Sequence, residues 1–219
     1  MSLTTLRERL IGRLEPVDRW SAEQAASGSD FDLNPDVDRP DRTLSAAAVL
    51  IPVIARPGGA TVLLTRRADS LASHTGQIAF PGGRLDAGET AVGAALREAT
   101  EEIALDRGAV EVLGLGDAYE TGTGYLVTPV IGWLAEPPVT KRAEAEVAEV
   151  FETPWDFLMD PANHRRDFYD REGQRRWFWA MPWEDRYIWG VTAGILRGVR
   201  RRLYGEDSAS VAALAEDAA

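Results

Sequence analysis

Cysteine is absent from this chain of 219 residues, and histidine occurs only twice. These absences exclude disulfides, a thiolate nucleophile and cysteine-ligated zinc, so any metal chemistry has to rely mainly on oxygen ligands. Long apolar runs are lacking too. The longest, residues 44–55 with Ser45 inside it, is too short to span a bilayer, and the first residues form no continuous apolar segment of a secretory signal. We therefore expect a cytoplasmic protein with no membrane partner.

Basic side chains are in the minority, because 24 Lys and Arg against 35 Asp and Glu give a formal net charge of -11. A protein that binds duplex nucleic acid gains its affinity from clustered basic residues, so we expect no nucleic-acid partner. A small phosphorylated substrate remains compatible, since a few Arg residues and a bound cation reverse the field inside one cleft. The length and the 45% hydrophobic composition predict one folded domain. The sequence leaves open whether the protein forms a homodimer.

Apolar periodicity divides the chain into three parts. Residues 1–42 begin with an amphipathic helix, 3–14, and continue as an irregular acidic connection. Residues 205–219 form an acidic tail for which we predict disorder or a frayed helix. Residues 43–204 form the domain. Its expected elements are two β-rich runs joined by a tight turn (44–56 and 61–67), a helix (89–103), three strands (110–116, 125–133 and 147–153), a hairpin (168–169 and 175–179) and a closing helix (189–204).

Three carboxylates, Glu98, Glu101 and Glu102, fall within a sector of about 100° on the second predicted helix. Carboxylates at such spacings repel one another unless a cation lies on them. Hard oxygen ligands suit Mg²⁺ or Mn²⁺, the cofactors that a phosphate-cleaving site needs. Arg97 can hold Glu101 by a charge-assisted bond. Taken alone, three glutamates are better explained as a solvated helix face, because Glu is a good helix former.

The full segment of residues 83–105 changes that balance, because it resembles the Nudix box, G-x5-E-x7-R-E-U-x-E-E-x-G-U, where U is a bulky apolar residue. The matching residues are Gly83, Glu89, Arg97, Glu98, Glu101, Glu102 and Leu105, with Ala99 as a small stand-in for U. Ala104 departs from the pattern, since the family has a Gly that ends the helix in a left-handed conformation. Ala there should strain the cap by roughly 1 kcal/mol or shift the backbone, without removing a metal ligand.

The resemblance implies an α/β Nudix fold, an α/β/α sandwich around a mixed β-sheet, with the box as a loop–helix–loop. It also implies that Glu98 and Glu102 are the principal metal ligands, that Glu101 is a further ligand or a neighbour of one, and that the Gly82 carbonyl joins them. The general base of the family comes from the box or from a downstream acid. Glu98 is our first candidate and Glu146 our second.

Two orienting residues follow from the same resemblance, which makes Glu89 and Arg97 salt-bridge partners. The reaction implied is attack of a metal-activated water on one phosphorus of a pyrophosphate, with a Glu taking the proton. Loss of box carboxylates would favour a degenerate fold that senses a nucleotide without cleaving it. None is lost, so we favour an enzyme, although a fold alone does not fix a function.

Upstream, residues 63–68 and 76–83 (LLTRRA and GQIAFPGG) resemble LLTxR[SA]x3Rx3Gx3FPGG, the motif of the CoA pyrophosphatase branch. Arg67 falls on the first Arg of the motif, whereas Ala72 stands where a second Arg is expected. CoA offers a pyrophosphate and a 3′-phosphate to guanidinium groups. Alternation along a strand would point Arg66 and Arg67 to opposite faces, so we expect one of them, Arg67 by the motif, to grip a phosphate. The plain alternative for either is a solvated surface charge.

The remaining candidates of the substrate site lie close to this motif. His74 contacts a phosphate or hydrogen-bonds the loop, and both interpretations stay open. Gly82 and Gly83 are expected beside the substrate. Residues 181–183 and 188–193 resemble the closing segment of the branch, where aromatic side chains are more often core than ligand contacts.

The substrate implied by the branch is CoA or an acyl-CoA, cleaved to 3′,5′-ADP and 4′-phosphopantetheine or its acyl form. The alternative is another nucleoside diphosphate derivative, such as ADP-ribose or a dinucleotide.

Overall fold

The computed structural model describes residues 1–68, 76–171 and 173–206. The predictions for Ala72, His74 and the tail after Glu206 therefore lie outside the described residues. The helices are α1 (Leu3–Arg13), α2 (Ala91–Ile103), α3 (Trp155–Met159) and α4 (Val191–Tyr204), with 3₁₀ turns η1 (Val17–Arg19), η2 (Arg107–Ala109) and η3 (Pro161–Asn163). In the described part of the chain, no helix is long and apolar enough to cross a membrane.

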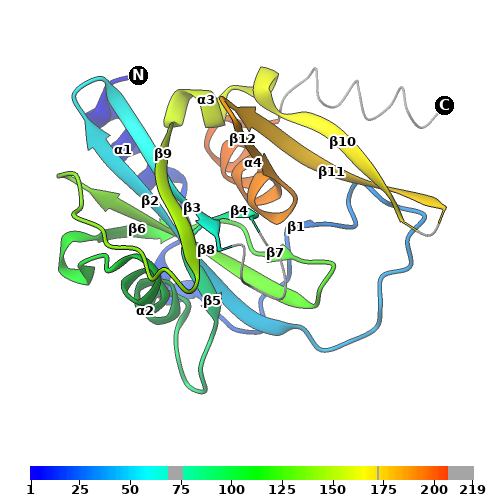
Figure 1. Ribbon diagram of the computed structural model, residues 1–219. Coiled ribbons are helices and arrows are strands. Elements are labelled where there is room, and N and C mark those ends of the chain that lie inside the picture. The colour runs from blue at the N-terminus through cyan, green and yellow to red at the C-terminus, as the bar shows by residue number, and fades with distance from the viewer. Residues whose placement is uncertain (69–75, 172, 207–219) are drawn as a thin grey trace.

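The strands form a large mixed sheet and a small antiparallel one (Figure 1). The strands of the large sheet are β1 (Gly28–Ser29), β2 (Ser45–Arg56), β3 (Gly59–Arg67), β4 (Ile78–Ala79), β5 (Gly82–Arg84), β6 (Glu111–Leu115), β7 (Tyr119–Glu120), β8 (Tyr125–Leu134) and β9 (Val147–Pro154). The small sheet contains β10 (Arg165–Arg171), β11 (Gln174–Trp183) and β12 (Arg186–Trp189).

Strand β2 lies at the centre of the large sheet. It runs parallel to β8 and antiparallel to β3 and β5. Beyond β3 lie β4 and β9, and beyond β8 lie β6 and β7, with β1 added parallel to β7. The sheet is mixed, as predicted.

Helices cover both faces of this sheet, with α2 on one side and α4 on the other (Figure 1). Strand β2 is buried on both faces, because Leu50 and Ile54 pack in the cluster of α2 while Ile51 and Val53 pack in the cluster of α1 and α4. Leu10 of α1 is fully buried in the second cluster. The predicted α/β/α sandwich is confirmed.

The structure corrects two predicted boundaries. The box helix starts at Ala91 and not at residue 89, because the Thr90 side chain accepts a hydrogen bond from the Gly93 N–H and caps the helix. The closing helix starts at Val191, because Trp189 belongs to β12 and Gly190, at φ 61°, turns the chain between them.

The predicted C-terminal hairpin is longer than expected, since β10 and β11 pair from Arg165↔Ala180 to Arg171↔Gln174.

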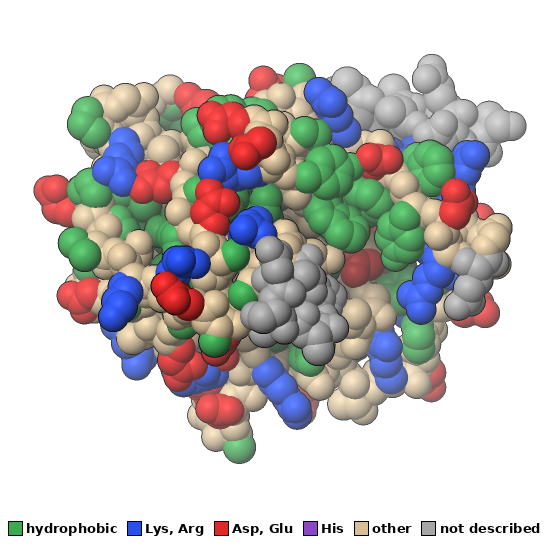
Figure 2. Space-filling view, in the orientation of Figure 1, with side chains coloured by type: hydrophobic (Ala, Val, Ile, Leu, Met, Phe, Trp, Pro, Cys, Tyr) green, Lys and Arg blue, Asp and Glu red, His purple; other side chains and the backbone are tan. Residues whose placement is uncertain are grey.

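On one face of the small sheet, the rings of Tyr169, Phe178 and Trp189 form a row with centroids 5.9 and 4.9 Å apart. Figure 2 shows hydrophobic side chains gathered in front of β11. The small sheet therefore contributes aromatic surface as well as core.

The irregular connection after α1 is held to the sheet by polar side chains. Asp30 accepts hydrogen bonds from the Tyr119 hydroxyl (2.8 Å) and the Gly122 N–H (2.7 Å). The Asn34 amide donates to the Trp177 carbonyl and accepts from its N–H. In this segment, hydrogen bonds from side chains to the sheet take the place of the backbone hydrogen bonds of a helix or strand.

Candidate active site

The Gly82-Gly83 corner passes between β2 and α2 with no room for a side chain. A Cβ on Gly82 would lie 2.5 Å from the Ala48 oxygen and 2.7 Å from the Val49 Cα atom. A Cβ on Gly83 would overlap the carboxylate of Glu98. Glycine is required here for close approach, which brings the corner backbone against the carboxylates of the box.

Glu102 is the buried carboxyl group of the site, with 5% of its surface exposed. Its Oε2 accepts the Gly82 N–H at 3.3 Å. Burial raises the pKa of Glu102 to about 8, and the nearby charges of Glu98 and Glu146 act in the same direction, whereas the Gly82 N–H and the Arg67 guanidinium lower it. The residues predicted for the site therefore lie close enough to Glu102 to change its pKa.

Arg97 is the hub of the other box carboxylates. Its Nε and Nη2 each donate to one oxygen of Glu89 at 3.0 Å, which is a bidentate pair. Its Nη1 donates to Glu98 at 2.8 Å and to Glu101 at 3.1 Å. The Arg97 guanidinium holds the pKa of Glu89 below its usual value. Arg97, itself held by Glu89, therefore fixes the position of the Glu98 side chain.

The three predicted carboxylates differ in exposure. The Glu98 side chain is 17% exposed and that of Glu101 is 57% exposed. In the described part of the chain, no three His, Cys, Asp or Glu residues cluster tightly enough to be recognised as a metal site. A buried Glu102 beside Glu98 nevertheless fits a divalent cation, because oxygen donors and uncompensated negative charge are what Mg²⁺ and Mn²⁺ prefer.

A β-bulge separates Arg66 from Arg67 at the end of β3. In the backbone register of β3 and β9, Arg66 lies opposite Glu149 and Arg67 lies opposite Val147. Ala148 of β9 is therefore the extra residue. Arg67 lies near Glu102, whose pKa it lowers, and its Nε is buried without a hydrogen-bond partner among the described residues. Arg67 thus lies close to the box, and its contact with a phosphate stays a prediction.

Residues 141–147 fasten the end of α2 and bring Glu146 to it. The N–H groups of Lys141 and Ala143 donate to the carbonyls of Ile103 and Glu102, which are otherwise unsatisfied at a helix end. The Glu146 carbonyl accepts the Ala68 N–H at 2.9 Å. This downstream acid therefore lies between β3 and the box.

Ala104 adopts the left-handed conformation that the family assigns to glycine, with φ 54° and ψ 32°. Its N–H donates to the Thr100 carbonyl, and the Leu105 N–H donates to the Ala99 carbonyl. We expected Ala104 either to adopt this strained conformation or to shift the backbone away from it. The structure shows the strained left-handed conformation.

Sequence reasoning missed Glu149 and Arg186, which form an ion pair of 2.6 Å next to Arg66. No motif marks them, because Arg186 lies on the C-terminal sheet and meets β9 only in the fold. The charged groups around Arg66 could not have been found from spacing.

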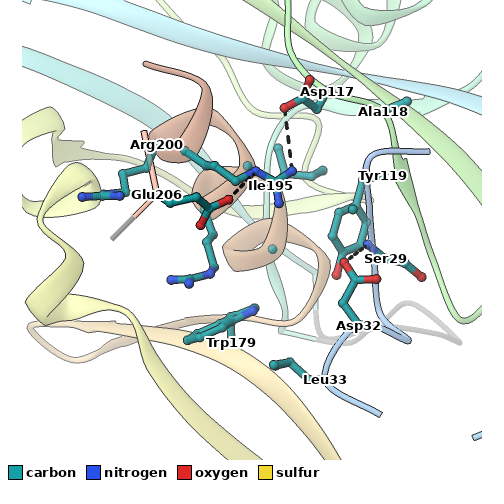
Figure 3. Close-up of a pocket in the computed structure, with 15 residues that line it drawn as sticks. Ser29, Asp32, Leu33, Asp117, Ala118, Tyr119, Trp179, Ile195, Arg200 and Glu206 are labelled. Carbon is teal, nitrogen blue, oxygen red and sulfur yellow. Dashed lines mark hydrogen bonds and ion pairs between the residues drawn. The ribbon is translucent and has the colours of Figure 1, made fainter. Parts of the chain in front are cut away.

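A cavity of about 230 Å³ opens between α4, β1, β7 and β11 (Figure 3). Arg201 lines this cavity and forms ion pairs with Asp117 (3.9 Å) and Glu206 (3.8 Å). None of the residues lining this cavity was predicted as a site residue.

A second cavity, of about 540 Å³, lies between Trp20 and the loop that precedes α2, beside Glu89. It borders the part of the box that contains Glu89, the partner of Arg97.

Comparison with known proteins identifies the family. Among solved structures, the M. smegmatis Nudix hydrolase RenU superposes with a TM-score of 0.46 at 31% identity, over 54% of this chain and 76% of its own. A C. elegans Ap4A hydrolase gives 0.45 at 22% identity, over 52% and 82%.

Two sequence relatives are more similar. The "Uncharacterized Nudix hydrolase NudL" of Escherichia coli O6:H1 is 42% identical over 167 residues, which are 75% of this chain and 86% of the relative. Its namesake in Shigella boydii serotype 4 matches to the same extent. The family model of the NUDIX domain matches residues 44–171. This chain therefore belongs to the Nudix hydrolase family.

Proposed function

We propose that this Nudix hydrolase cleaves the pyrophosphate of CoA and acyl-CoA, with release of 3′,5′-ADP and 4′-phosphopantetheine or its acyl form. The observation that carries the proposal is the position of Arg67, the first Arg of the CoA-type motif, next to Glu102 of the box. A guanidinium at this point would grip the phosphates at the place where the cleaved bond must lie.

Glu98 and Glu102, together with the Gly82 carbonyl, would hold Mg²⁺ or Mn²⁺, with Glu101 as a further ligand or neighbour. A divalent ion bound there would lower the pKa of the attacking water and neutralise the leaving phosphate. Such a cation would stabilise the ionised form of Glu102, because burial raises the pKa of this carboxyl group. Arg97 and Glu89 orient Glu98 through the bidentate pair.

Glu98 is the first candidate for the base, since one of its oxygens accepts a hydrogen bond from Arg97 while the other accepts none within the described part of the chain. Glu146 is the second candidate, because it lies near enough to Glu102 to raise its pKa. Proton uptake by either carboxylate would complete the attack of water.

A second substrate class is favoured by one observation, that Ala72 occupies the position of the second motif Arg. A chain with one phosphate contact fewer would suit a nucleoside diphosphate derivative without a 3′-phosphate, such as ADP-ribose or a dinucleotide.

A product assay with CoA, ADP-ribose, NADH and nucleoside triphosphates, each with Mg²⁺ and with Mn²⁺, tests the proposal. We expect CoA to give the highest kcat/KM and 3′,5′-ADP to be a product. Faster cleavage of ADP-ribose than of CoA would move the chain to the second substrate class.

A further inference from the structure

The cavity between α4, β1, β7 and β11 lies apart from the candidate active site (Figure 3). It adjoins α4, which covers the face of the large sheet opposite to α2. None of the residues that line it belongs to the box or to the CoA-type motif. Its volume of about 230 Å³ is below the roughly 300–1,000 Å³ of pockets for drug-sized ligands, so it suits a ligand much smaller than CoA.

Two glycines of α4 lie on the wall of this cavity. Gly194 is required for close approach, because a Cβ there would lie 2.6 Å from the Tyr119 hydroxyl oxygen. Gly198, one turn further on, has no such neighbour, since a Cβ there would meet nothing within 4 Å. Glycine is a poor helix former, so neither packing nor helix propensity accounts for Gly198. Its effect is to leave room on the cavity side of the helix.

Arginines of α4 form the basic side of the cavity, which is lined by Arg197, Arg200 and Arg201. The Arg197 guanidinium lies over the Trp179 ring, 3.8 Å from its centroid. Burial lowers the pKa of His164, and the charges of Arg197 and Arg200 lower it further. These charges therefore act on groups inside the protein and are not fully screened by water.

Arg201 is only loosely paired with the acids beside it. Its distances to Asp117 and Glu206, 3.9 and 3.8 Å, exceed the length of a hydrogen bond. Asp117 lies closer to Arg202, at 3.2 Å, and the Glu206 side chain is 64% exposed. The Nη2 of Arg201 donates to the Ser27 carbonyl at 2.9 Å. A guanidinium has five N–H donors, so Arg201 retains donors for an anionic group in the cavity.

Asp32 provides a negative group on another side of the cavity. Figure 3 shows it across the cavity from Arg200 and Glu206. Its Oδ2 accepts the Ser29 N–H at 2.9 Å, and its Oδ1 accepts no hydrogen bond within the described part of the chain. Burial raises the pKa of Asp30, and the charge of Asp32 raises it further. The cavity is therefore polarised, with arginines on one side and a carboxylate on the other.

We infer that this cavity binds a small zwitterion, such as a free α-amino acid, with its carboxylate at Arg201 and its ammonium group at Asp32. Leu33 and Ile195 line the same cavity and offer apolar contact to an aliphatic side chain. A ligand with both charges forms a charge-assisted contact on each side, whereas a ligand with one charge leaves one side without a partner. The inference is independent of the proposed function, because it involves no residue of the box.

Calorimetric titration of the intact protein with L-leucine tests the inference. Two analogues each lack one charge, since 4-methylpentanoate has no ammonium group and 3-methylbutylamine has no carboxylate. We expect leucine to bind at least about tenfold more tightly than either analogue, the range of one charge-assisted contact. Equal affinity for leucine and one of the analogues, or no saturable binding of leucine, would overturn the inference.

Substitutions on the two sides separate the two charges. Asp32→Asn should lower the affinity for leucine about tenfold and leave that for 4-methylpentanoate unchanged. Arg201→Gln should weaken leucine and 4-methylpentanoate about tenfold and leave 3-methylbutylamine unchanged. Asp36→Asn is the matched control, because Asp36 is an exposed acid of the same segment outside the cavity, and it should bind leucine as the wild type does. An equal loss in Asp36→Asn and Asp32→Asn would overturn the assignment of the ammonium site.

Gly198→Leu fills the cavity without removing a polar contact, so it keeps the test decisive even if Arg201→Gln is unstable. We expect its melting temperature to be equal or higher, because Leu is the better helix former. Its affinity for leucine should fall at least about tenfold. An unchanged affinity would place the binding outside this cavity and overturn the inference.

Discussion

At the scale of single residues, the surroundings of Glu102 disfavour a charged carboxyl group, because burial raises its pKa to about 8. We predict that Glu102→Gln lowers kcat at least about 100-fold, since a metal ligand supplies several kcal/mol of transition-state stabilisation. The amide keeps an oxygen for the Gly82 N–H and removes the buried charge, so the melting temperature in EDTA should be equal or higher.

Kinetics and thermal melting of the variant measure both effects. Glu111→Gln is a suitable control, because Glu111 is an exposed glutamate paired with Arg7. A melting temperature that collapses in Glu102→Gln would show that the residue is structural.

The Tyr119 hydroxyl, which donates to Asp30, is the basis of a prediction on pH. Burial raises the pKa of Asp30, and the hydroxyl opposes that rise. A carboxyl group with a raised folded-state pKa stabilises the fold fully only below its unfolded pKa, and this contribution is lost as the pH rises through the folded-state pKa. Tyr119→Phe raises the pKa of Asp30 further, so its cost must grow with pH.

We expect Tyr119→Phe to lower the free energy of unfolding by about 0.5–1.5 kcal/mol when Asp30 is protonated and by about 1.5–3 kcal/mol when it is ionised. Denaturant unfolding between pH 4 and 8 checks this. Tyr187→Phe, which removes a hydroxyl bound to the exposed Asp167, should show little change. Equal losses at both ends of the pH range would contradict the role of the Asp30 charge.

At the scale of elements, the C-terminus of α2 holds strain at Ala104. A non-glycine residue at φ 54° is disfavoured by about 1–2 kcal/mol, part of which glycine gives back as unfolded-state entropy. We predict that Ala104→Gly raises the free energy of unfolding by about 0.5–1 kcal/mol, measured by urea denaturation. Ala99→Gly, inside the same helix and fully buried, should be destabilising. A destabilised Ala104→Gly would show that the alanine cap is compensated elsewhere.

Long elements could be predicted from the sequence, and short ones could not. The apolar runs of β2 and β3, the turn between them and the periodicity of α4 are local signals. Strands β1, β4 and β7 contain two residues each and exist only because a neighbouring strand provides their hydrogen bonds. The box pair of Glu89 and Arg97 was predicted through the resemblance to the family motif, whereas Glu149 and Arg186 meet only through the pairing of distant strands.

At the scale of the whole molecule, the candidate site is built from segments that meet at the edge of the central sheet. Strand β3 supplies Arg67, the β5 corner and α2 supply the box, and the residues before β9 supply Glu146. Arginines at this edge offset the negative field of a chain with net charge -11. The acidic surface and a phosphorylated substrate are thus compatible.

Global stability should respond to the metal that the site is proposed to hold. A cation that binds only the folded state stabilises it by RT ln(1 + [L]/Kd), about 2.7 kcal/mol at a hundredfold excess over Kd. For a chain of this size that corresponds to a rise of about 5–10 °C in the melting temperature. We predict this rise with Mg²⁺ or Mn²⁺ and no turnover in EDTA.

Glu102→Gln should lose most of the rise, because the buried carboxylate is the proposed ligand, whereas Glu111→Gln should keep it. Differential scanning calorimetry over a range of Mg²⁺ concentrations, paired with turnover in the same buffers, measures both predictions. A melting temperature that does not depend on the cation, together with full turnover in EDTA, would exclude the metal site. Stabilisation that persists in Glu102→Gln would instead place the cation on other carboxylates.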